Sequence, residues 1–269
     1  MIQPDLKNKD LIYSKVIDEC ESTNDLVRTL GEKHFAHGSW TSAHRQKSGR
    51  GRMGRDWVSQ EGNLFLSILL RPTQPERVTW LPHAVGVGVL RVLKNNFSDL
   101  DFRLKWPNDV YIGRAKLGGI LCEGFSGSKN NPKSFVVAGI GLNVGVAPKI
   151  PQAQTTALAD QVGRALLVER LCDQLRLEIV ESVMEVVWHL ETEGFSLLKK
   201  EYERALLFQP GDTIQWRDQE DQNIVFRGEV EALGEKGELL VWTPAHGLKA
   251  LFSEEVTFGL LGNSASPVG

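Results

Sequence analysis

The sequence predicts a mixed α+β fold in which helices cover a largely antiparallel sheet, followed by a small all-β module. Helix-spaced apolar stripes alternate with short strand-like runs up to about residue 208. Beyond Pro210 and Gly211 only short alternating runs between turn residues remain, which indicates an all-β segment. The 269 residues suit one large and one small domain, and we divide the chain into residues 1–208 and 209–269.

The first elements are a helix, two strands and a second helix. Residues 22–31 begin with the capping cluster Ser-Thr-Asn and continue with helix-spaced apolar residues. Residues 38–43 predict a short strand, and residues 63–72 predict a buried strand that ends at a proline. Residues 78–96 carry the apolar face of a helix.

Four short strands and two helices complete the large domain. The strand-like runs read FRLKW, VYIG, KLGGILCE and SFVVAGIGLNVG, with a hairpin loop at residues 126–132. Residues 156–161 predict a short capped helix, and residues 168–193 predict the longest helix. The small module consists of the runs DTIQW, VFRGEVEAL, GELLVW and VTFGLL.

The composition indicates a globular protein of the cytoplasm. Hydrophobic residues make up 41% and charged residues 24% of the chain, and no apolar run reaches the ~20 residues that span a bilayer. Residues 1–10 lack the apolar run of a signal peptide. Cys20, Cys122 and Cys172 are too few and too scattered for a disulfide framework or a zinc site, so we expect reduced thiols.

A basic, glycine-rich loop is the most informative feature of the sequence. Five cations lie between Arg45 and Arg55, although the formal net charge of the chain is -3. Glycines separate the arginines of the segment SGRGRMGRDW and let backbone approach a ligand closely. Because arginine grips phosphate or carboxylate with a planar fork, the loop is predicted to bind an anion and to become ordered around it.

The segment KWPND follows one of the predicted strands. Proline fixes the backbone of a turn there, and Asn108 and Asp109 bond to it locally. Asp109 is a candidate ligand for Mg²⁺, which prefers carboxylate and phosphate oxygens. Lys105 and Asn108 are candidate phosphate contacts. A solvated hairpin turn is the alternative interpretation of this segment.

Glycines mark two further strands. Gly118 and Gly119 interrupt the run KLGGIL, as happens where a ligand or another backbone approaches closely, and a bulge at a sheet edge is the alternative. Asn143 leaves a strand between glycines in the run GIGLNVG, for which a structural turn is the alternative.

The order of these motifs resembles that of the biotin–protein ligases, enzymes that attach biotin to a lysine of a carrier protein. The resemblance runs from about Ser22 into the C-terminal region and is most specific in GRGRMGR and KWPND. It implies a class II synthetase-like catalytic domain and a small C-terminal SH3-like β-barrel. Because only 21 residues precede Ser22, we expect a form without an N-terminal DNA-binding domain and no DNA partner.

The resemblance also implies an ATP-dependent reaction. Biotin and ATP would form biotinyl-5′-AMP with Mg²⁺ present, and biotin would then pass to a lysine of a biotin carboxyl carrier protein domain. Biotin contacts would come from Ser22, Thr23, Asn24, Gln46, Gly49, Arg50, Gly51, Arg52, Lys116, Gly118 and Gly119. ATP contacts would come from Arg52, Arg55, Trp57, Lys105, Asn108, Lys116 and Asn143.

Lys116 and Arg52 are the expected catalytic residues, because cations stabilise charge that builds on phosphoryl oxygens. Asp109 would hold the metal. A place in the core is the alternative for Trp57. Position 53 of the loop is Met, where some relatives carry another cation. Because Arg50, Arg52 and Arg55 remain, we expect the loop to keep its function.

Three other interpretations stay open. A lipoate–protein ligase would share the fold and the reaction type, although GRGRMGR and KWPND favour biotin. A single-stranded nucleic-acid-binding protein would also use Gly-Arg runs with aromatic residues, but the basic patch is short and the chain is net acidic. An inactive relative is the third. An exposed sheet edge could form a homodimer or dock the carrier.

Overall fold

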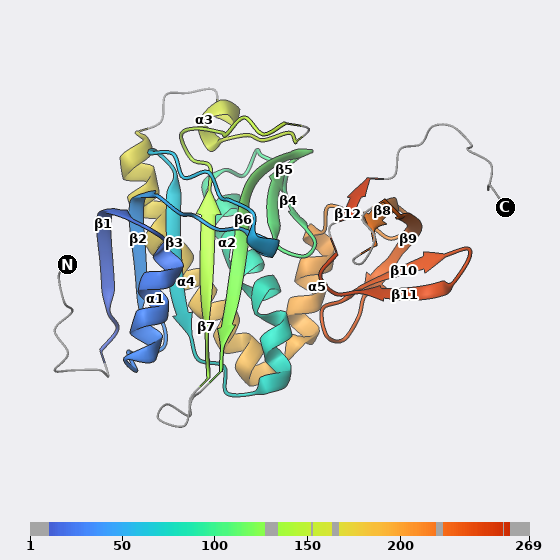
Figure 1. Cartoon of the computed structure of the whole chain (residues 1–269), viewed down its shortest axis with the longest axis horizontal. Helices are drawn as coiled ribbons and strands as arrows, with labels where there is room; N and C mark the ends of the chain where they lie inside the picture. Colours follow the sequence, from blue (N-terminus) through green and yellow to red (C-terminus); the bar gives the residue numbers. More distant parts are fainter. Residues whose placement is uncertain are drawn as a thin grey trace.

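In the computed structural model, which describes residues 11–126, 134–151, 153–162, 167–218, 223–254 and 256–258, the larger sheet has seven strands (Figure 1). They run in the order β1-β2-β3-β7-β6-β5-β4. Their bounds are Ser14–Cys20 (β1), Trp40–Gln46 (β2), Leu64–Leu70 (β3), Phe102–Lys105 (β4), Asp109–Ile112 (β5), Ala115–Phe125 (β6) and Phe135–Leu142 (β7). The predicted hairpin loop at residues 126–132 lies, apart from residue 126, outside the described part of the chain.

The sheet is antiparallel except at one edge. β1 and β2 pair in parallel, and the helix α1 (Thr23–Glu32) forms the crossover between them. The five remaining pairs are antiparallel, which confirms the predicted largely antiparallel sheet. α1 therefore starts where β1 ends, and its first residues lie at one end of the sheet.

Side chains of successive residues point to opposite faces of this sheet. In β3, Leu64, Leu66, Ile68 and Leu70 belong to the large hydrophobic core. Leu69 belongs instead to a smaller cluster with Val27 and Leu30 of α1. The helices α2 (Leu81–Asn96) and α4 (Val168–Glu193) lie on the large-core face, and α1 covers part of the other face.

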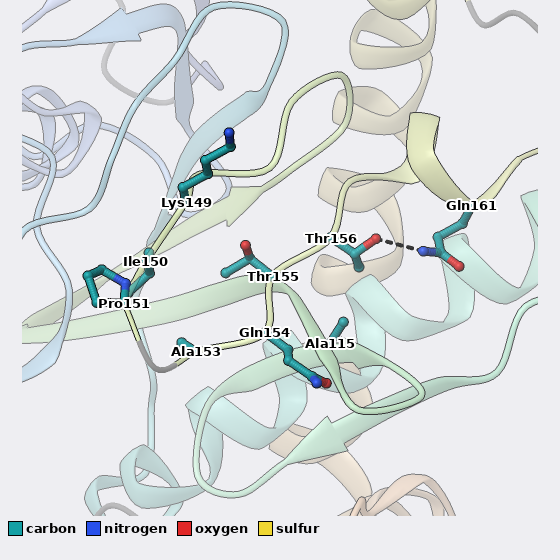
Figure 2. A pocket seen from close by; sticks show the side chains of 9 residues that line it. All are labelled: Ala115, Lys149, Ile150, Pro151, Ala153, Gln154, Thr155, Thr156 and Gln161. Atoms are coloured by element: carbon teal, nitrogen blue, oxygen red, sulfur yellow. Dashed lines mark hydrogen bonds between the residues drawn. The ribbon is translucent and has the colours of Figure 1, made fainter.

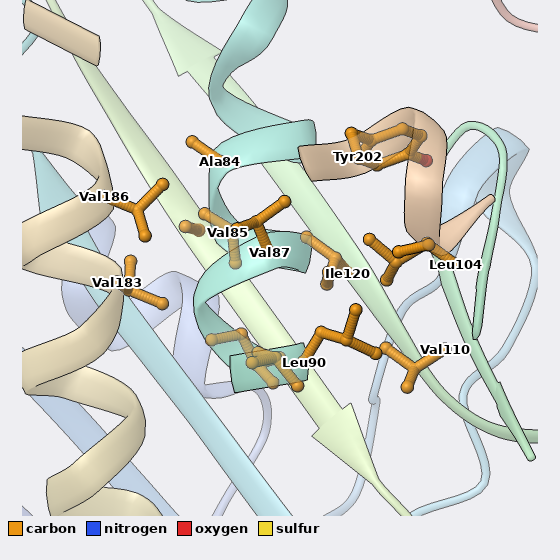
Figure 3. Close-up of a cluster of buried hydrophobic side chains, with 14 of the residues drawn as sticks. Ala84, Val85, Val87, Leu90, Leu104, Val110, Ile120, Val183, Val186 and Tyr202 are labelled. Carbon is orange, nitrogen blue, oxygen red and sulfur yellow. The ribbon is translucent and has the colours of Figure 1, made fainter. Parts of the chain in front are cut away.

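The large core is packed tightly between α2, α4 and the sheet (Figure 3). A Cβ at Gly88 of α2 would lie 2.9 Å from the Cα of Val183 in α4, so only glycine allows the two helices to come this close. Three further helical segments are η2 (Pro75–Trp80), α3 (Leu158–Gln161) and α5 (Phe195–Ala205). All four predicted helices are confirmed, whereas α5 and β1 were not predicted.

The C-terminal module is a five-stranded antiparallel sheet in the order β11-β10-β9-β8-β12. Its strands are β8 (Thr213–Arg217), β9 (Val225–Leu233), β10 (Leu239–Thr243), β11 (Gly247–Leu251) and β12 (Val256–Phe258). The sheet is consistent with the expected SH3-like module, but within the described residues its edge strands β11 and β12 do not pair and no barrel closes. The division at residue 208 stays a prediction.

Candidate functional site

Glycines line the sheet face that α1 partly covers. In the register of β6 with β7, Gly119 lies opposite Gly141. A Cβ at Gly119 would lie 3.1 Å from Cζ3 of Trp57, and one at Gly141 would lie 2.6 Å from Cε2 of the same indole. The indole of Trp57 therefore lies directly against these two glycines, and we call Gly119 and Gly141 the glycine floor.

Gly118 does not belong to this floor. A Cβ at Gly118 would run into the side chain of Leu142, a residue of the large core, at 2.4 Å. Because adjacent strand residues face opposite sides, the Cβ positions of Gly118 and Gly119 point to different faces of the sheet. The backbone contact of both glycines with biotin stays a prediction.

The residues that begin α1 form a buried polar seat. Ser22, Thr23 and Asn24 are each at most 5% exposed. The backbone N–H of Thr23 donates to Gln46 Oε1 at 2.8 Å, and the Thr23 hydroxyl donates to the same oxygen at 3.1 Å. Ser22 stands at the N-cap position without a side-chain capping bond. Two of the predicted biotin residues, Thr23 and Gln46, are thus hydrogen-bonded to each other.

Ser67 and Glu123 join this seat from the sheet. The Ser67 hydroxyl lies 2.7 Å from Thr23 Oγ1 and 2.6 Å from Asn24 Oδ1. The Asn24 amide donates to Glu123 Oε2 at 2.6 Å. Neither residue was predicted from the sequence. A lone serine inside the apolar run LFLSILL is the signal that would have pointed to Ser67, because buried polar groups need partners.

Arg50 is paired with carboxylates of the protein itself. Its guanidinium donates two bonds to Asp25 of α1, at 2.7 and 2.9 Å, and lies 3.6 Å from Glu123. The bonds from Arg50 hold the pKa of Asp25 below its usual range. Arg50 therefore joins the basic loop to α1, a contact that the sequence prediction of a biotin ligand did not include.

The middle of the basic loop forms the 3₁₀ turn η1 (Arg52–Gly54). Met53 has a φ of 56° and is 74% exposed, so the residue that replaces a cation points into solvent. Arg52 reaches back to the sheet, where its Nη1 donates to Asn108 Oδ1 at 3.1 Å. Arg55 donates from Nε to the Arg52 carbonyl at 3.3 Å. The loop is thus held closed by side chains of its own arginines.

Lys116 completes a cluster with the KWPND segment. Its ammonium lies 2.8 Å from Asp109 Oδ1 and 5.5 Å from the ring centre of Trp57. Both members of the ion pair are mostly buried, with side chains 26% and 17% exposed. Arg52 binds Asn108 and Lys116 binds Asp109, so the two cations are held by neighbouring residues of the chain. We refer to Arg52 and Lys116 as the cation cluster.

Four other predicted residues make contacts within the protein, and their binding roles stay predictions. Lys105 is buried with its ammonium 5.7 Å from the ring centre of Tyr111. Asn143 is buried and donates to the Thr156 carbonyl at 3.1 Å. Gly49 brings the two limbs of the basic loop together, since a Cβ there would lie 2.6 Å from Ser59 Oγ. Gly51 donates its N–H to the Arg55 carbonyl at 2.7 Å.

A cavity of about 660 Å³ is lined by Ala115, the neighbour of Lys116 in the chain (Figure 2). The segment 154–156, which also lines the cavity, is bonded to the backbone of Lys116: Lys116 N–H donates to the Gln154 carbonyl at 2.8 Å, and Thr156 N–H donates to the Lys116 carbonyl at 2.9 Å. The volume suits a small molecule. The sequence did not predict the lining, which consists of Ala115, Lys149, Ile150, Pro151, Ala153, Gln154, Thr155, Thr156 and Gln161.

The chain was compared with known proteins. The sequence profile of the biotin/lipoate A/B protein ligase family matches residues 16–143. The bifunctional ligase/repressor BirA of Bacillus subtilis is 28% identical over 270 residues, which cover 96% of this chain and 77% of the relative. The biotin–[acetyl-CoA-carboxylase] ligase of Mycobacterium tuberculosis is 32% identical over 62% of this chain and 64% of its own length.

A solved structure agrees with this result. The biotin protein ligase from Aquifex aeolicus in complex with biotin and ATP superposes with a TM-score of 0.75 at 29% identity, over 92% of this chain and 99% of that one. This similarity over nearly the whole chain supports an enzyme of this ligase class. The chain thus matches the biotin/lipoate A/B protein ligase family over residues 16–143 and is similar to biotin–protein ligases over most of its length.

None of the helices in the described part of the chain has the length and apolar character that crossing a bilayer requires.

Proposed function

We propose that the protein joins biotin to ATP, releases pyrophosphate, and transfers biotin from biotinyl-5′-AMP to a lysine of a biotin carboxyl carrier domain. The observation that carries this proposal is the meeting of Arg52 and Lys116 at Asn108 and Asp109, next to the polar seat at Thr23 and Gln46. One end of the site suits a neutral polar ring and the other suits two anions.

The polar seat would hold the ureido group of biotin. Thr23 and Gln46 supply a hydroxyl and an amide that can reorganise around an urea oxygen and its two N–H groups. The glycine floor would then lie under the ring. A site built on such bonds discriminates strongly against acids that lack them, so lipoate would be a poor substrate.

The cations would act on the first step. A carboxylate oxygen of biotin attacks the α-phosphorus, a new P–O bond forms, and the bond to the β-phosphate bridge breaks as pyrophosphate leaves. Arg52 and Lys116 would bring the two anions together and stabilise charge on the α-phosphoryl oxygens. Because both cations are already held by protein groups, little reorganisation is needed at the moment of reaction.

The second step needs no nucleophile from the enzyme. The amine of a carrier lysine attacks the acyl carbon of the mixed anhydride, loses a proton, and AMP leaves. The closed basic loop, with Trp57 beneath it, would exclude water from the anhydride until the lysine arrives. The carrier is a domain of a biotin-dependent carboxylase in this proposal.

The nucleotide would extend from Lys116 toward the cavity of about 660 Å³, where Lys149 adds a cation. Asp109 is a single carboxylate, and in the described residues no three potential metal ligands cluster. That donor set fits a magnesium ion that is held mainly by nucleotide phosphates and only once by protein. A cytoplasmic setting belongs to the proposal, because ATP and three free thiols suit a reducing compartment.

Exchange of labelled pyrophosphate into ATP tests the first step. With magnesium and biotin the purified protein is expected to catalyse exchange, and lipoate as the only acid should support little. Exchange with lipoate and not biotin would reassign the substrate. A folded protein that exchanges with neither acid would refute the ligase activity.

A further inference from the structure

The small β module is fastened to the large domain by one of its own turns. The turn at residues 234–238 joins β9 to β10, and it receives hydrogen bonds from two buried indoles of the large domain. Trp80 Nε1 donates to the Glu235 carbonyl at 2.7 Å, and Trp106 Nε1 donates to the Gly237 carbonyl at 2.9 Å. Both tryptophans are 1% exposed. We call residues 234–238 the docking turn.

The docking turn has no room to shift toward the large domain. Gly237 has a φ of 80°, and a Cβ at this position would lie 2.7 Å from Cε1 of His83. His83 is itself packed between Trp80 and Tyr202, at ring-centre distances of 5.0 and 4.6 Å. The turn therefore fixes where the whole small module sits.

A second contact from the small module reaches the proposed active site. The carbonyl of Ser253, in the segment after β11, accepts a hydrogen bond from Arg52 Nη2 at 2.7 Å. The carboxylate of Glu254 shapes this segment, because it accepts from the backbone N–H groups of Phe252 and Ser253 at 2.7 and 2.9 Å. The Arg52 guanidinium is thus held by Asn108 on one side and by the small module on the other.

The docking turn is also linked to Arg52 through the KWPND segment. Trp106, which binds the docking turn, is separated from Asn108 only by Pro107. Movement of the docking turn would therefore disturb Arg52 by two routes, through the KWPND segment and through Ser253. The tryptophan of KWPND, to which the proposed reaction gives no part, receives a role in this way.

We propose that the small β module is a positioning element for Arg52, with the docking turn and Trp106 setting its place. Its catalytic consequence rests on the proposed ligase function, whereas the positioning itself is a property of the ligand-free protein. Arg52 would remain the group that touches substrate, and the docking turn would act only through it.

Amide hydrogen exchange on the ligand-free full-length protein tests the positioning. Gly237→Ala forces the docking turn away from His83. Gly247→Ala is the matched control, because Gly247 also has a positive φ, of 67°, in the same module but has nothing within 4 Å of its Cβ position. In Gly237→Ala we expect exchange in residues 49–57 to become about tenfold faster, the effect of losing one bond to a charged group. Gly247→Ala should leave these residues unchanged.

Unchanged exchange in residues 49–57 of Gly237→Ala, with faster exchange in the docking turn, would overturn the proposal. If Gly237→Ala does not fold, Trp106→Phe replaces it. That change removes the bond to the Gly237 carbonyl together with part of the buried ring. The result is judged by the same comparison of exchange in residues 49–57 and in the docking turn.

A double-mutant cycle tests the catalytic consequence. If the module acts through Arg52, Gly237→Ala should lower the adenylation rate more than the biotin affinity, and it should cost nothing further in an Arg52→Ala background. Additive losses would show a general structural effect and refute the catalytic role. A wild-type protein without biotin-dependent exchange would refute the proposed function instead, and the hydrogen-exchange comparison would still decide the positioning.

Discussion

Lys116 and Asp109 form an ion pair of 2.8 Å between β6 and the neighbouring strand β5, which begins at the last residue of the KWPND segment. The carboxylate fixes the ammonium beside the indole of Trp57 before any substrate binds. A cation held in this way stabilises developing charge without first having to be ordered.

Lys116→Ala is expected to lower the adenylation rate by about 100-fold or more, because it removes a preorganised charge from the transition state. Biotin binding, measured by calorimetry, should remain detectable because the polar seat is untouched. Lys47→Ala is the control, since Lys47 is a cation of the same sequence region paired with Glu19 at the surface. A near-normal exchange rate in Lys116→Ala would remove this residue from the mechanism.

Arg52→Gly should still form adenylate but release it. The change removes the bonds to Asn108 and Ser253 that hold the loop closed. We expect labelling of lysines on an unrelated bystander protein, read by streptavidin blot, where the wild type labels only its carrier. Arg45→Ala, which affects a surface contact with Glu19, is the control. A variant that stays specific for the carrier would contradict a lid role for Arg52.

Comparing Ser67→Ala with Ser42→Ala distinguishes an effect on protein stability from an effect on biotin binding. Ser67 and Ser42 are both fully buried, and the Ser42 hydroxyl donates to the Phe65 carbonyl at 2.7 Å. Each alanine variant should lose about 1–2 kcal/mol of unfolding free energy in urea titrations. Only Ser67→Ala should also weaken biotin binding, by about tenfold, because Ser67 orders Thr23 and Asn24. Equal affinities in the two variants would place Ser67 outside the seat.

His83 predicts a loss of stability in mild acid. Burial lowers its pKa to about 4, an effect that nearby backbone at Thr79 and Gly237 only partly offsets. The folded state thus keeps the ring neutral while the unfolded state takes up a proton near pH 6.5. The His83 contribution is complete above pH 6.5 and is lost as the pH falls toward 4, by about 3 kcal/mol in all.

His83→Gln should flatten the dependence of unfolding free energy on pH in this window. Burial also lowers the pKa of His37, so the variant should keep a smaller slope of the same sign. The Asp25 carboxylate loses its contribution only at lower pH, because Arg50 holds its pKa below the ordinary 3.8. An unchanged slope between pH 6.5 and 4 in His83→Gln would show that His83 does not titrate as proposed.

The regular elements of the large domain could be predicted from local patterns. The stripe Leu175, Ile179 and Val183 is buried, and α4 spans residues 168–193 as predicted. β1 escaped prediction because it is an edge strand with polar residues on both faces. α5 escaped because it follows α4 after a single residue, Gly194, and reads as its continuation.

The site was predicted only where a motif is contiguous. Asn108 and Asp109 lie next to the two cations as their shared segment suggested. The partners that come from distant strands were missed, because Ser67 and Glu123 depend on the register between β3, β7 and β6. The docking turn lies more than 120 residues from Trp106 in the chain, and no local pattern indicates that contact.

The indole of Trp57 across Gly119 and Gly141 has a thermodynamic consequence. In the free protein the indole of Trp57 already covers this apolar floor. A ligand that displaces the indole therefore covers surface that was already shielded from water. The net apolar area withdrawn from water on binding is then smaller than the contact area of the ligand. The heat capacity should therefore fall less on binding than the buried surface of the complex would suggest, and part of the affinity would be set by where the displaced indole comes to rest.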